Sequence, residues 1–270
     1  MYEKRPIRTE DVKKIHALLS ELKQGPLGSP VRFELAAAKE SDSDVLRGLG
    51  TYGFIRYPAG FIVGAVRSSP AGLVDFGYLM QSVLLVLIDM GLGTCWLGST
   101  FRKSRFADYI GVRDNEIVPA VVSVGYPVGR RGILDQVVRF AAGSKKRKSP
   151  EELFFRSDFQ TPLPMDKENL FSRILEMVRL APSASNRQPW RIVYDPDHNL
   201  YHFFLQRTKS YQPHKMGLAD LQCTDIGIAM CHFAMGAESF RLHGNWIEEM
   251  PKLNHLPSSA EYIVTWKSVS

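Results

Sequence analysis

A repeated order of secondary-structure elements is the feature that most constrains the fold of this chain. Each half of the sequence has the pattern of an amphipathic helix, two strands, a long apolar helix and a further strand. Asp75-Phe76-Gly77 and Asp225-Ile226-Gly227 begin the two apolar helices and lie 150 positions apart. Trp96 and Trp246, just past the ends of these helices, are separated by the same interval. Matching intervals indicate a duplicated unit, although many α+β chains show this order of elements without a duplication.

Hydrophobic periodicity and turn residues predict the individual elements. In the first half we expect helices at 10–22, 74–90 and 102–110, and strands at 31–35, 53–66 and 118–124, the second of which continues past Pro58. In the second half we expect helices at 170–178 and 225–240, and strands at 191–194, 201–205 and 262–266. The predicted fold is α+β, with two degenerate half-units at 1–150 and 151–270. Their helices cover either two antiparallel sheets or one shared layer.

The composition is that of an ordinary globular protein in a reducing compartment. Of the 270 residues, 44% are hydrophobic and 23% are charged, which excludes disordered and fibrous classes. The three cysteines are odd in number and far apart, which argues against a disulfide framework. The charged segment Met1–Lys14 lacks the apolar core of a signal peptide, and the most apolar run, Leu79–Leu92, is shorter than the ~20 residues that span a bilayer. We therefore expect a cytoplasmic protein without a membrane segment.

Part of the positive charge lies in one short run. The formal net charge is +6, and Lys145-Lys146-Arg147-Lys148 contains basic residues only. Most such runs are solvated linkers. No aromatic residues are interleaved with this one, as they would be in a nucleic-acid patch, so we expect no nucleic-acid partner. A site for a phosphorylated cofactor also fits, and charge alone does not distinguish it from a linker.

Common catalytic and metal-binding motifs are absent from the sequence. The seven histidines form neither an H-E-x-x-H motif nor paired Cys/His spacings, so no metal site is predicted. The sequence has no G-x-S-x-G elbow, no G-x-x-x-x-G-K-[ST] loop and no G-x-G-x-x-G fingerprint after a strand. A self-sufficient hydrolase, a P-loop enzyme and a Rossmann dehydrogenase are therefore disfavoured, and no catalytic side chain can be named.

Two segments have a composition that suits a planar, partly polar ligand. Pro182–Trp190 combines prolines, small hydroxyls and amides, which offer donors and acceptors to the edge of a ring. Gly91–Gly98 has three glycines around a short apolar strand, which permit a close approach of the backbone. Each segment also has a purely structural interpretation, as a helix end and turn or as a helix stop before a packed tryptophan.

The same segments resemble the flavin-dependent nitroreductase family. The run Leu180–Trp190 resembles the family motif A-P-S-x-x-N-x-Q-P-W, and Gly91–Gly98 resembles the loop after its central helix, which begins with D-x-G. Gly125-Tyr126-Pro127 and Lys146–Leu153 resemble a strand end and the basic segment at the end of the family's chain. The A-P-S-x-x-N motif lies here in the second half and the glycine loop in the first. This arrangement is similar to the tandem branch of the family, in which one chain imitates a homodimer.

The resemblance implies a nitroreductase-like intramolecular pseudo-dimer that binds FMN. The residues expected at the cofactor are Ser183, Ala184, Asn186, Gln188, Trp96, Leu97, Gly98, Arg147 and Lys148. Among these, Arg147 and Lys148 are expected near the FMN phosphate, where charge-assisted hydrogen bonds are strongest. Each half has only one of the two motifs, which predicts one flavin per chain. A dimer is then not required to build the site, so a monomer is possible.

The implied function is an oxidoreductase that uses NAD(P)H to reduce a small-molecule acceptor, such as a nitro compound or a quinone. One departure from the family leaves alternatives open. The family usually begins with R-x-S-x-R, whose arginines hold FMN, whereas Lys4-Arg5-Pro6-Ile7-Arg8 is at most a distorted version. A flavin- or nucleotide-binding sensor or carrier without turnover, or a relic without a cofactor, would also have these features.

Overall fold

The computed structural model describes residues 1–37, 55–98, 103–128, 146–208, 211 and 219–269, with the backbone alone at 103 and 104. Contacts within the chain divide it into two compact units. Unit 1 consists of Met1–Ala141 and Pro213–Leu221, and unit 2 of Ala142–Gln212 and Gln222–Ser270. The boundary between the units therefore falls before the expected position at 150, and the basic run that precedes Pro150 belongs to unit 2.

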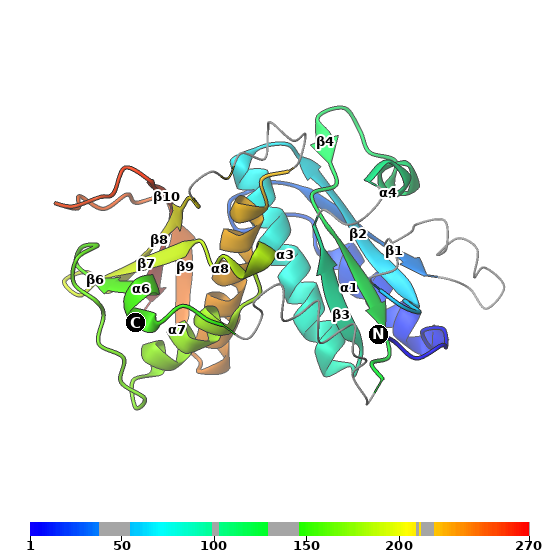
Figure 1. Ribbon diagram of the computed structural model, residues 1–270, viewed down its shortest axis with the longest axis horizontal. Helices are drawn as coiled ribbons and strands as arrows, with labels where there is room; N and C mark the ends of the chain where they lie inside the picture. Colours follow the sequence, from blue (N-terminus) through cyan, green and yellow to red (C-terminus); the bar gives the residue numbers. More distant parts are fainter. Residues whose placement is uncertain (38–54, 99–102, 129–145, 209–210, 212–218, 270) are drawn as a thin grey trace. The chain divides into compact units, whose positions relative to one another are not determined.

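Unit 1 contains three helices and a five-stranded sheet among its described residues (Figure 1). Its helices are α1 (Thr9–Glu21), α3 (Pro70–Asp89) and α4 (Lys103–Ile110), and its strands are β1 (Val31–Ala37), β2 (Gly60–Arg67), β3 (Gly93–Leu97), β4 (Glu116–Ile117) and β5 (Val121–Gly125). The start of α3 is fixed locally, because the Ser69 hydroxyl accepts a hydrogen bond from the Gly72 amide and Pro70 occupies the first turn.

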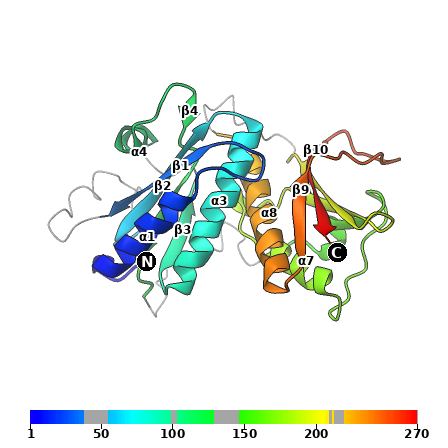
Figure 2. The same cartoon turned by 180° about the vertical axis from the view of Figure 1, so that it is seen from behind.

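The sheet of unit 1 is antiparallel and is covered on both faces. The strand order is β1-β2-β5-β3, with β4 paired to β2. Helices α1 and α3 lie on one side of the sheet (Figure 2), where Phe76 of α3 packs on Phe33 of β1. On the other face Phe106 of α4 packs edge-on against Phe61 of β2, with ring centroids 5.2 Å apart. A strand that is covered on both faces has no solvent-facing side, so its polar and apolar residues do not alternate. This explains why β2 is buried along almost its whole length.

Unit 2 contains a second sheet of five strands. Its helices are α6 (Pro150–Leu153), α7 (Leu170–Leu180) and α8 (Leu221–Ser239), whose first residue is assigned to unit 1, with the short 3-10 helix η1 (Ala184–Asn186). Its strands are β6 (Phe154–Arg156), β7 (Trp190–Asp195), β8 (Leu200–Gln206), β9 (His243–Ile247) and β10 (Ala260–Val269), in the order β6-β7-β8-β10-β9.

Aromatic side chains form the core between this sheet and its helices. Phe233 of α8 lies against Tyr201 and Phe203 of β8, Trp246 of β9 and Trp266 of β10. Alternate positions of one strand face the same side of a sheet, so β8 presents two aromatic rings to one helix residue. The Phe171 ring of α7 stacks on Tyr201 from the same side, with a centroid distance of 4.8 Å.

The two units have the same strand order, as the repeated sequence pattern predicts. The order β1-β2-β5-β3 of unit 1 corresponds to β7-β8-β10-β9 of unit 2, with antiparallel pairing throughout. The aspartates of the two D-x-G motifs also have the same role. Asp75 accepts hydrogen bonds from the Leu27 and Ser29 amides, and Asp225 accepts one from the Ala184 amide. In both units this carboxylate therefore holds the loop that follows the first helix.

The α+β fold is confirmed, and of the two expected arrangements the structure has two separate sheets. The strand expected at 53–66 was too long, since β2 begins at Gly60, after Pro58. The strand expected at 118–124 begins only at Val121, as β5, after Pro119, which has no amide hydrogen to donate. The expectation that all pairing is antiparallel was also wrong at one place, because β6 pairs with β7 in parallel. Strands β4, β6 and β9 were not predicted.

Helix α3 is the apolar helix that the sequence places in the core. Among the residues that the structure describes, it is the one helix long and apolar enough to cross a membrane, but 67% of its most apolar window is buried. Burial of this extent is that of a core helix.

Candidate functional site

The segment from Pro182 to Trp190 connects α7 to β7 and has an unusual backbone. Ser185, Asn186 and Gln188 have φ angles of 49°, 54° and 48°. Positive φ is uncommon outside glycine, and asparagine tolerates it better than glutamine or serine. Three such residues within four positions mark a conformation that its surroundings must impose, and strain of this kind is concentrated at functional sites.

Contacts within unit 2 hold this segment in place. The Ala184 amide donates to Asp225 Oδ1 at 2.8 Å, and the Gln188 amide donates to the Ser183 hydroxyl at 2.9 Å. Trp190, at the end of the segment, is completely buried. Of the residues expected at the cofactor, Ser183 and Ala184 are thus tied to the fold of the segment itself.

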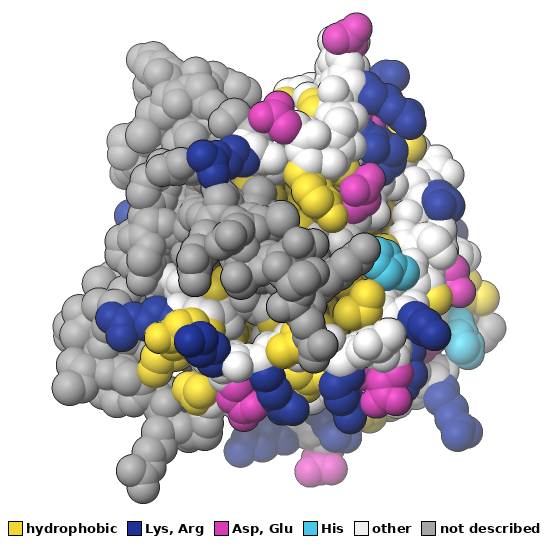
Figure 3. Space-filling view, turned by 90° about the vertical axis from the view of Figure 1, so that its right-hand side faces the viewer, with side chains coloured by type: hydrophobic (Ala, Val, Ile, Leu, Met, Phe, Trp, Pro, Cys, Tyr) yellow, Lys and Arg dark blue, Asp and Glu magenta, His cyan; other side chains and the backbone are white. Residues whose placement is uncertain are grey.

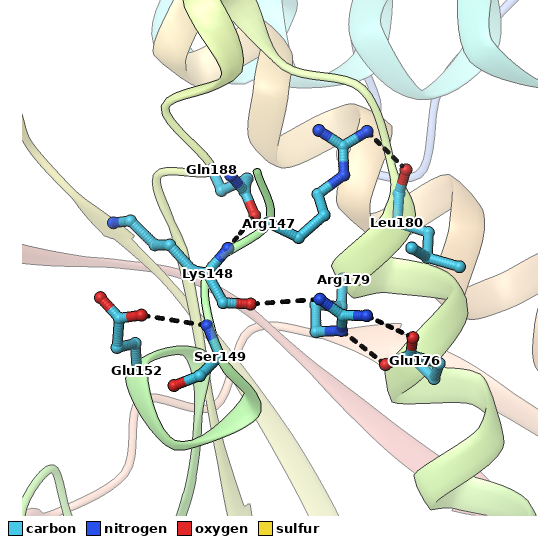
Figure 4. Close-up of polar contacts among 8 residues, drawn as sticks. All are labelled: Arg147, Lys148, Ser149, Glu152, Glu176, Arg179, Leu180 and Gln188. Atoms are coloured by element: carbon cyan, nitrogen blue, oxygen red, sulfur yellow. Dashed lines mark hydrogen bonds and ion pairs between the residues drawn. The ribbon is translucent and has the colours of Figure 1, made fainter. Parts of the chain in front are cut away.

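The basic residues 146–148 contact this segment, and Figure 4 shows Lys148 beside Gln188. The buried Gln188 side chain accepts a hydrogen bond from the Lys148 amide at 2.9 Å and donates one to the Asn186 carbonyl. The Asn186 side chain accepts from the Arg147 guanidinium and donates to the Lys146 carbonyl. The structure therefore brings Arg147, Lys148, Asn186 and Gln188 together, as the sequence predicts. Their contacts are with one another.

These residues border a cavity of about 510 Å³ within unit 2. Every residue that lines it is polar or charged, with six basic side chains and one acidic one. The lining residues are Lys146, Arg147, Lys148, Glu152, Ser185, Asn186, Arg187, Gln188, Arg191, Gln206, Arg207 and Thr208. On the face shown in Figure 3, by contrast, Lys and Arg are spread over the described surface together with Asp and Glu. The cavity is therefore a local concentration of positive charge, suited to an anionic group and not to an apolar ring.

The electrostatics of this basic cavity are those of crowded, partly desolvated cations. Burial, with the nearby Arg191 charge as a second cause, lowers the pKa of Lys148 to about 8. Burial also lowers the pKa of Arg191 to about 10. The charged form of each group is thus destabilised in the unliganded protein. An anion in the cavity would remove this penalty.

Eight of the lining residues lie outside the expected set, among them Arg187, Arg191, Arg207 and Thr208. Arg187 and Arg191 lie within and just after the predicted motif, and Arg207 and Thr208 follow β8. The run Asn186-Arg187-Gln188-Pro189-Trp190-Arg191 contains a signal, namely two further arginines beside a polar motif. Arg207 and Thr208 are brought near by the pairing of β7 with β8, where Trp190 faces Leu205.

The remaining expected residues, Trp96, Leu97 and Gly98, lie in unit 1 at and just after β3. The Trp96 indole nitrogen donates to Gln81 Oε1 at 3.0 Å, and Leu97 is buried in the core. At Gly98 an added Cβ would lie 2.6 Å from Leu221 Cδ1, so the absence of a side chain has a packing reason. The cofactor contacts expected of these three residues stay predictions.

The N-terminal basic residues are engaged within unit 1. The Arg5 guanidinium lies 3.6 Å from the centroid of the Tyr126 ring and pairs with Glu3. The Arg8 guanidinium pairs with Asp11 at 2.8 Å and also contacts Glu10. Both arginine side chains therefore contact other residues of unit 1.

Comparisons with known proteins give one family. A family model with the description "Putative TM nitroreductase" matches residues 1–237. A crystal structure from Thermotoga maritima MSB8, described as a nitroreductase in the same terms, is 18% identical, and the match covers 99% of this chain and 87% of that one with a TM-score of 0.61. This likeness shows a shared fold.

Two other solved structures match about half of the chain. A nitroreductase family protein from Clostridium novyi NT is 19% identical over 50% of this chain and 83% of its own, with a TM-score of 0.37. An FMN-dependent nitroreductase from Clostridium difficile R20291 is 16% identical over 48% of this chain and 82% of its own, with a TM-score of 0.38. No protein of curated function matches. Because the family model extends through both units, the chain belongs to the nitroreductase family.

Proposed function

We propose that this protein is an FMN-dependent oxidoreductase, with NADH or NADPH as the electron donor and a nitro compound, quinone or similar small molecule as the acceptor. Family membership supports redox chemistry, and the resemblance of Leu180–Trp190 to the flavin-binding motif supports FMN. The observation that carries the proposal is the basic cavity next to Ser185–Gln188, which presents six cations and one carboxylate.

The chemistry of this cavity fits the phosphate end of FMN. Phosphate carries about 1.5 to 2 negative charges at neutral pH and three acceptor oxygens. The lysines and arginines of the cavity supply donors and opposite charge, and the amides of Asn186 and Gln188 hold residues 146–148 in position for it. The isoalloxazine ring needs apolar contacts that this lining lacks. We propose that Trp96, Leu97 and Gly98 supply contacts of that kind.

When bound, FMN would supply the transfer of hydride and electrons, while the protein would bind and orient the cofactor and its substrates. A general base is therefore not required, in agreement with the absence of an obvious one in the sequence. Each chain has one P-S-x-x-N segment and one glycine loop, so we propose one flavin per chain and a protein that can work as a monomer. We also propose a cytoplasmic location, which the small number of scattered cysteines supports.

Mass spectrometry and titration test the cofactor. We expect heat-treated protein to release FMN, and apoprotein titrated with FMN to saturate at one FMN per chain by native mass spectrometry. The release of FAD, or a failure to bind FMN after reconstitution, would contradict the proposal. Saturation at two FMN per chain would contradict the single-site reading alone.

A sensor or carrier without turnover is the second candidate function. It is favoured by one observation, since Arg5 and Arg8, the only arginines near the position of the family's N-terminal motif, have partners within unit 1. Steady-state oxidation of NADH and NADPH with a naphthoquinone acceptor separates the two. Turnover with bound FMN supports the enzyme, whereas stoichiometric binding without turnover supports the sensor.

The Asn186→Gly substitution tests the role of the motif. Glycine removes the side chain but tolerates the φ of 54°, whereas alanine would add backbone strain. Loss of the hydrogen bonds to Arg147 and Lys146 is expected to weaken FMN binding about 3- to 10-fold. Isothermal titration calorimetry measures the change, with exposed Asn245→Ala of β9 as the control. If Asn186→Gly destabilises the fold while FMN affinity stays unchanged, the residue serves the turn alone.

A further inference from the structure

The two tryptophans that lie 150 positions apart, Trp96 on β3 and Trp246 on β9, have different surroundings in their units. The Trp246 ring lies among the aromatic rings of Phe203, Phe233 and Trp266, with centroid distances of 5.1, 6.2 and 4.9 Å. Its indole nitrogen is buried and has no hydrogen-bond partner within the described part of the chain. Aromatic packing therefore sets the position of Trp246.

A directed hydrogen bond holds Trp96 instead. Its indole nitrogen donates to Gln81 Oε1 at 3.0 Å, and its ring packs edge-on against Phe76 with a centroid distance of 6.3 Å. Gln81 and Phe76 both belong to α3. Because a hydrogen bond is directional, the bond to Gln81 fixes the rotation of the indole ring as well as its position.

Gln81 has an amide where the equivalent position of the second repeat has none. Its side chain is 3% exposed, and a buried amide is costly unless it is hydrogen-bonded. The residue 150 positions later, in α8, is Cys231, which is completely buried and contacts the Met235 sulfur. Unit 2 thus builds the same helix and the same sheet order without an amide at this place, so the fold of the repeat does not require Gln81.

The segment that carries the tryptophan differs between the units in the same way. Gly91, Gly93 and Gly98 of unit 1 correspond to Arg241, His243 and Glu248 of unit 2, which are exposed. Glycines permit a close approach of a ligand to the backbone, and the larger residues do not. The glycines and the glutamine therefore occur together in unit 1 and are absent together from the equivalent positions of unit 2.

We propose that Gln81 is a positioning residue of the flavin site, which fixes the Trp96 indole in the orientation that contacts the isoalloxazine ring. This inference rests on the proposed function, which places Trp96 at that ring. Gln81 acts through Trp96 and does not itself touch the cofactor. Because the ring and not the phosphate is involved, the loss of this hydrogen bond affects FMN and riboflavin, which lacks the phosphate, to the same extent.

Substitutions at both ends of the hydrogen bond test this role in the full chain. Gln81→Met removes the acceptor and keeps the length of the side chain. We expect it to weaken the binding of FMN and of riboflavin about 3- to 10-fold each, the range for one hydrogen bond. Gln81→Glu retains an oxygen acceptor in either protonation state and should recover most of the affinity. In a Trp96→Phe background, which lacks the donor, Gln81→Met should change the affinity by less than about twofold.

The visible circular dichroism of the bound flavin gives a second measurement, because it responds to the groups around the ring. Gln81→Met and Trp96→Phe should change the same flavin bands, and the double variant should resemble Trp96→Phe. Trp246→Phe is the matched control, since it removes the indole nitrogen at the equivalent position of unit 2. It should leave both flavin affinities and the flavin bands unchanged.

The outcomes separate this inference from the proposed function. If the wild-type protein binds neither FMN nor riboflavin, the proposed function fails. If it binds both, and Gln81→Met lowers the urea midpoint of unfolding while the flavin affinities and bands stay unchanged, the hydrogen bond serves the fold alone and the inference is wrong. A loss of FMN binding without a loss of riboflavin binding would also contradict it. Should Gln81→Met not fold, Gln81→Leu, which also lacks the acceptor, takes its place in the same measurements.

Discussion

Replacing Trp190 with alanine is expected to lower the free energy of unfolding by about 3–5 kcal/mol, the range for a fully buried large aromatic side chain. Trp190 is completely buried at the first position of β7, opposite Leu205 of β8. Trp190 follows the strained segment Ser185–Gln188 by two positions, so the lost volume adjoins the end of that segment. We therefore expect flavin affinity to fall along with stability in this variant.

Trp190→Phe provides the control for this prediction. The indole nitrogen is buried and has no hydrogen-bond partner within the described part of the chain, so phenylalanine removes an unsatisfied donor while it keeps an aromatic ring. Its cost should be less than half that of alanine. Urea unfolding followed by circular dichroism measures both variants, with unchanged m values as the sign that only stability has changed. A loss below about 1 kcal/mol for Trp190→Ala would contradict the packing argument.

The fold was predictable because the repeat and the apolar periodicity reflect burial directly. The D-x-G aspartates, for example, indicate a repeat in the sequence, and in the structure Asp75 and Asp225 make equivalent contacts in the two units. Strand β6 could not be found in this way. It has three residues, Phe154–Arg156, and its parallel pairing to β7 depends on tertiary contacts that leave no period in so short a segment.

The site was predictable only in part, for a physical reason. Asn and Gln offer the same donors and acceptors to a flavin edge as to a neighbouring main chain. The resemblance predicts Asn186 and Gln188 as cofactor-binding residues, and in the structure their side chains contact residues 146–148, which the sequence did not show. Arg191 and Arg207 lie in the same cavity as those residues because β7 pairs with β8. The register of that hairpin cannot be predicted from the sequence of either strand alone.

The affinity for FMN is expected to fall as the pH rises above 8, by up to about tenfold per pH unit. The group responsible is Lys148, whose pKa in the unliganded protein is lowered to about 8 by burial and by the charge of Arg191. A bound phosphate dianion raises this pKa, so above pH 8 binding requires the uptake of one proton. Between pH 7 and 8 the lysine is already charged and phosphate, with its second pKa near 6, is mostly dianionic, so little change is expected there.

The groups around Lys148 decide whether this slope can be assigned to it. Glu152 raises the pKa of Lys148, and Arg191 and Arg187 lower it. Of these, Arg191 keeps its charge up to pH 9, because its own pKa is about 10. Titrations with FMN at pH 7, 8, 8.5 and 9 should therefore show the slope in the wild type, a flat and weaker response in Lys148→Gln, and no slope with riboflavin. A slope that survives in Lys148→Gln would assign the proton to another group, and a flat wild-type profile would place the phosphate away from Lys148.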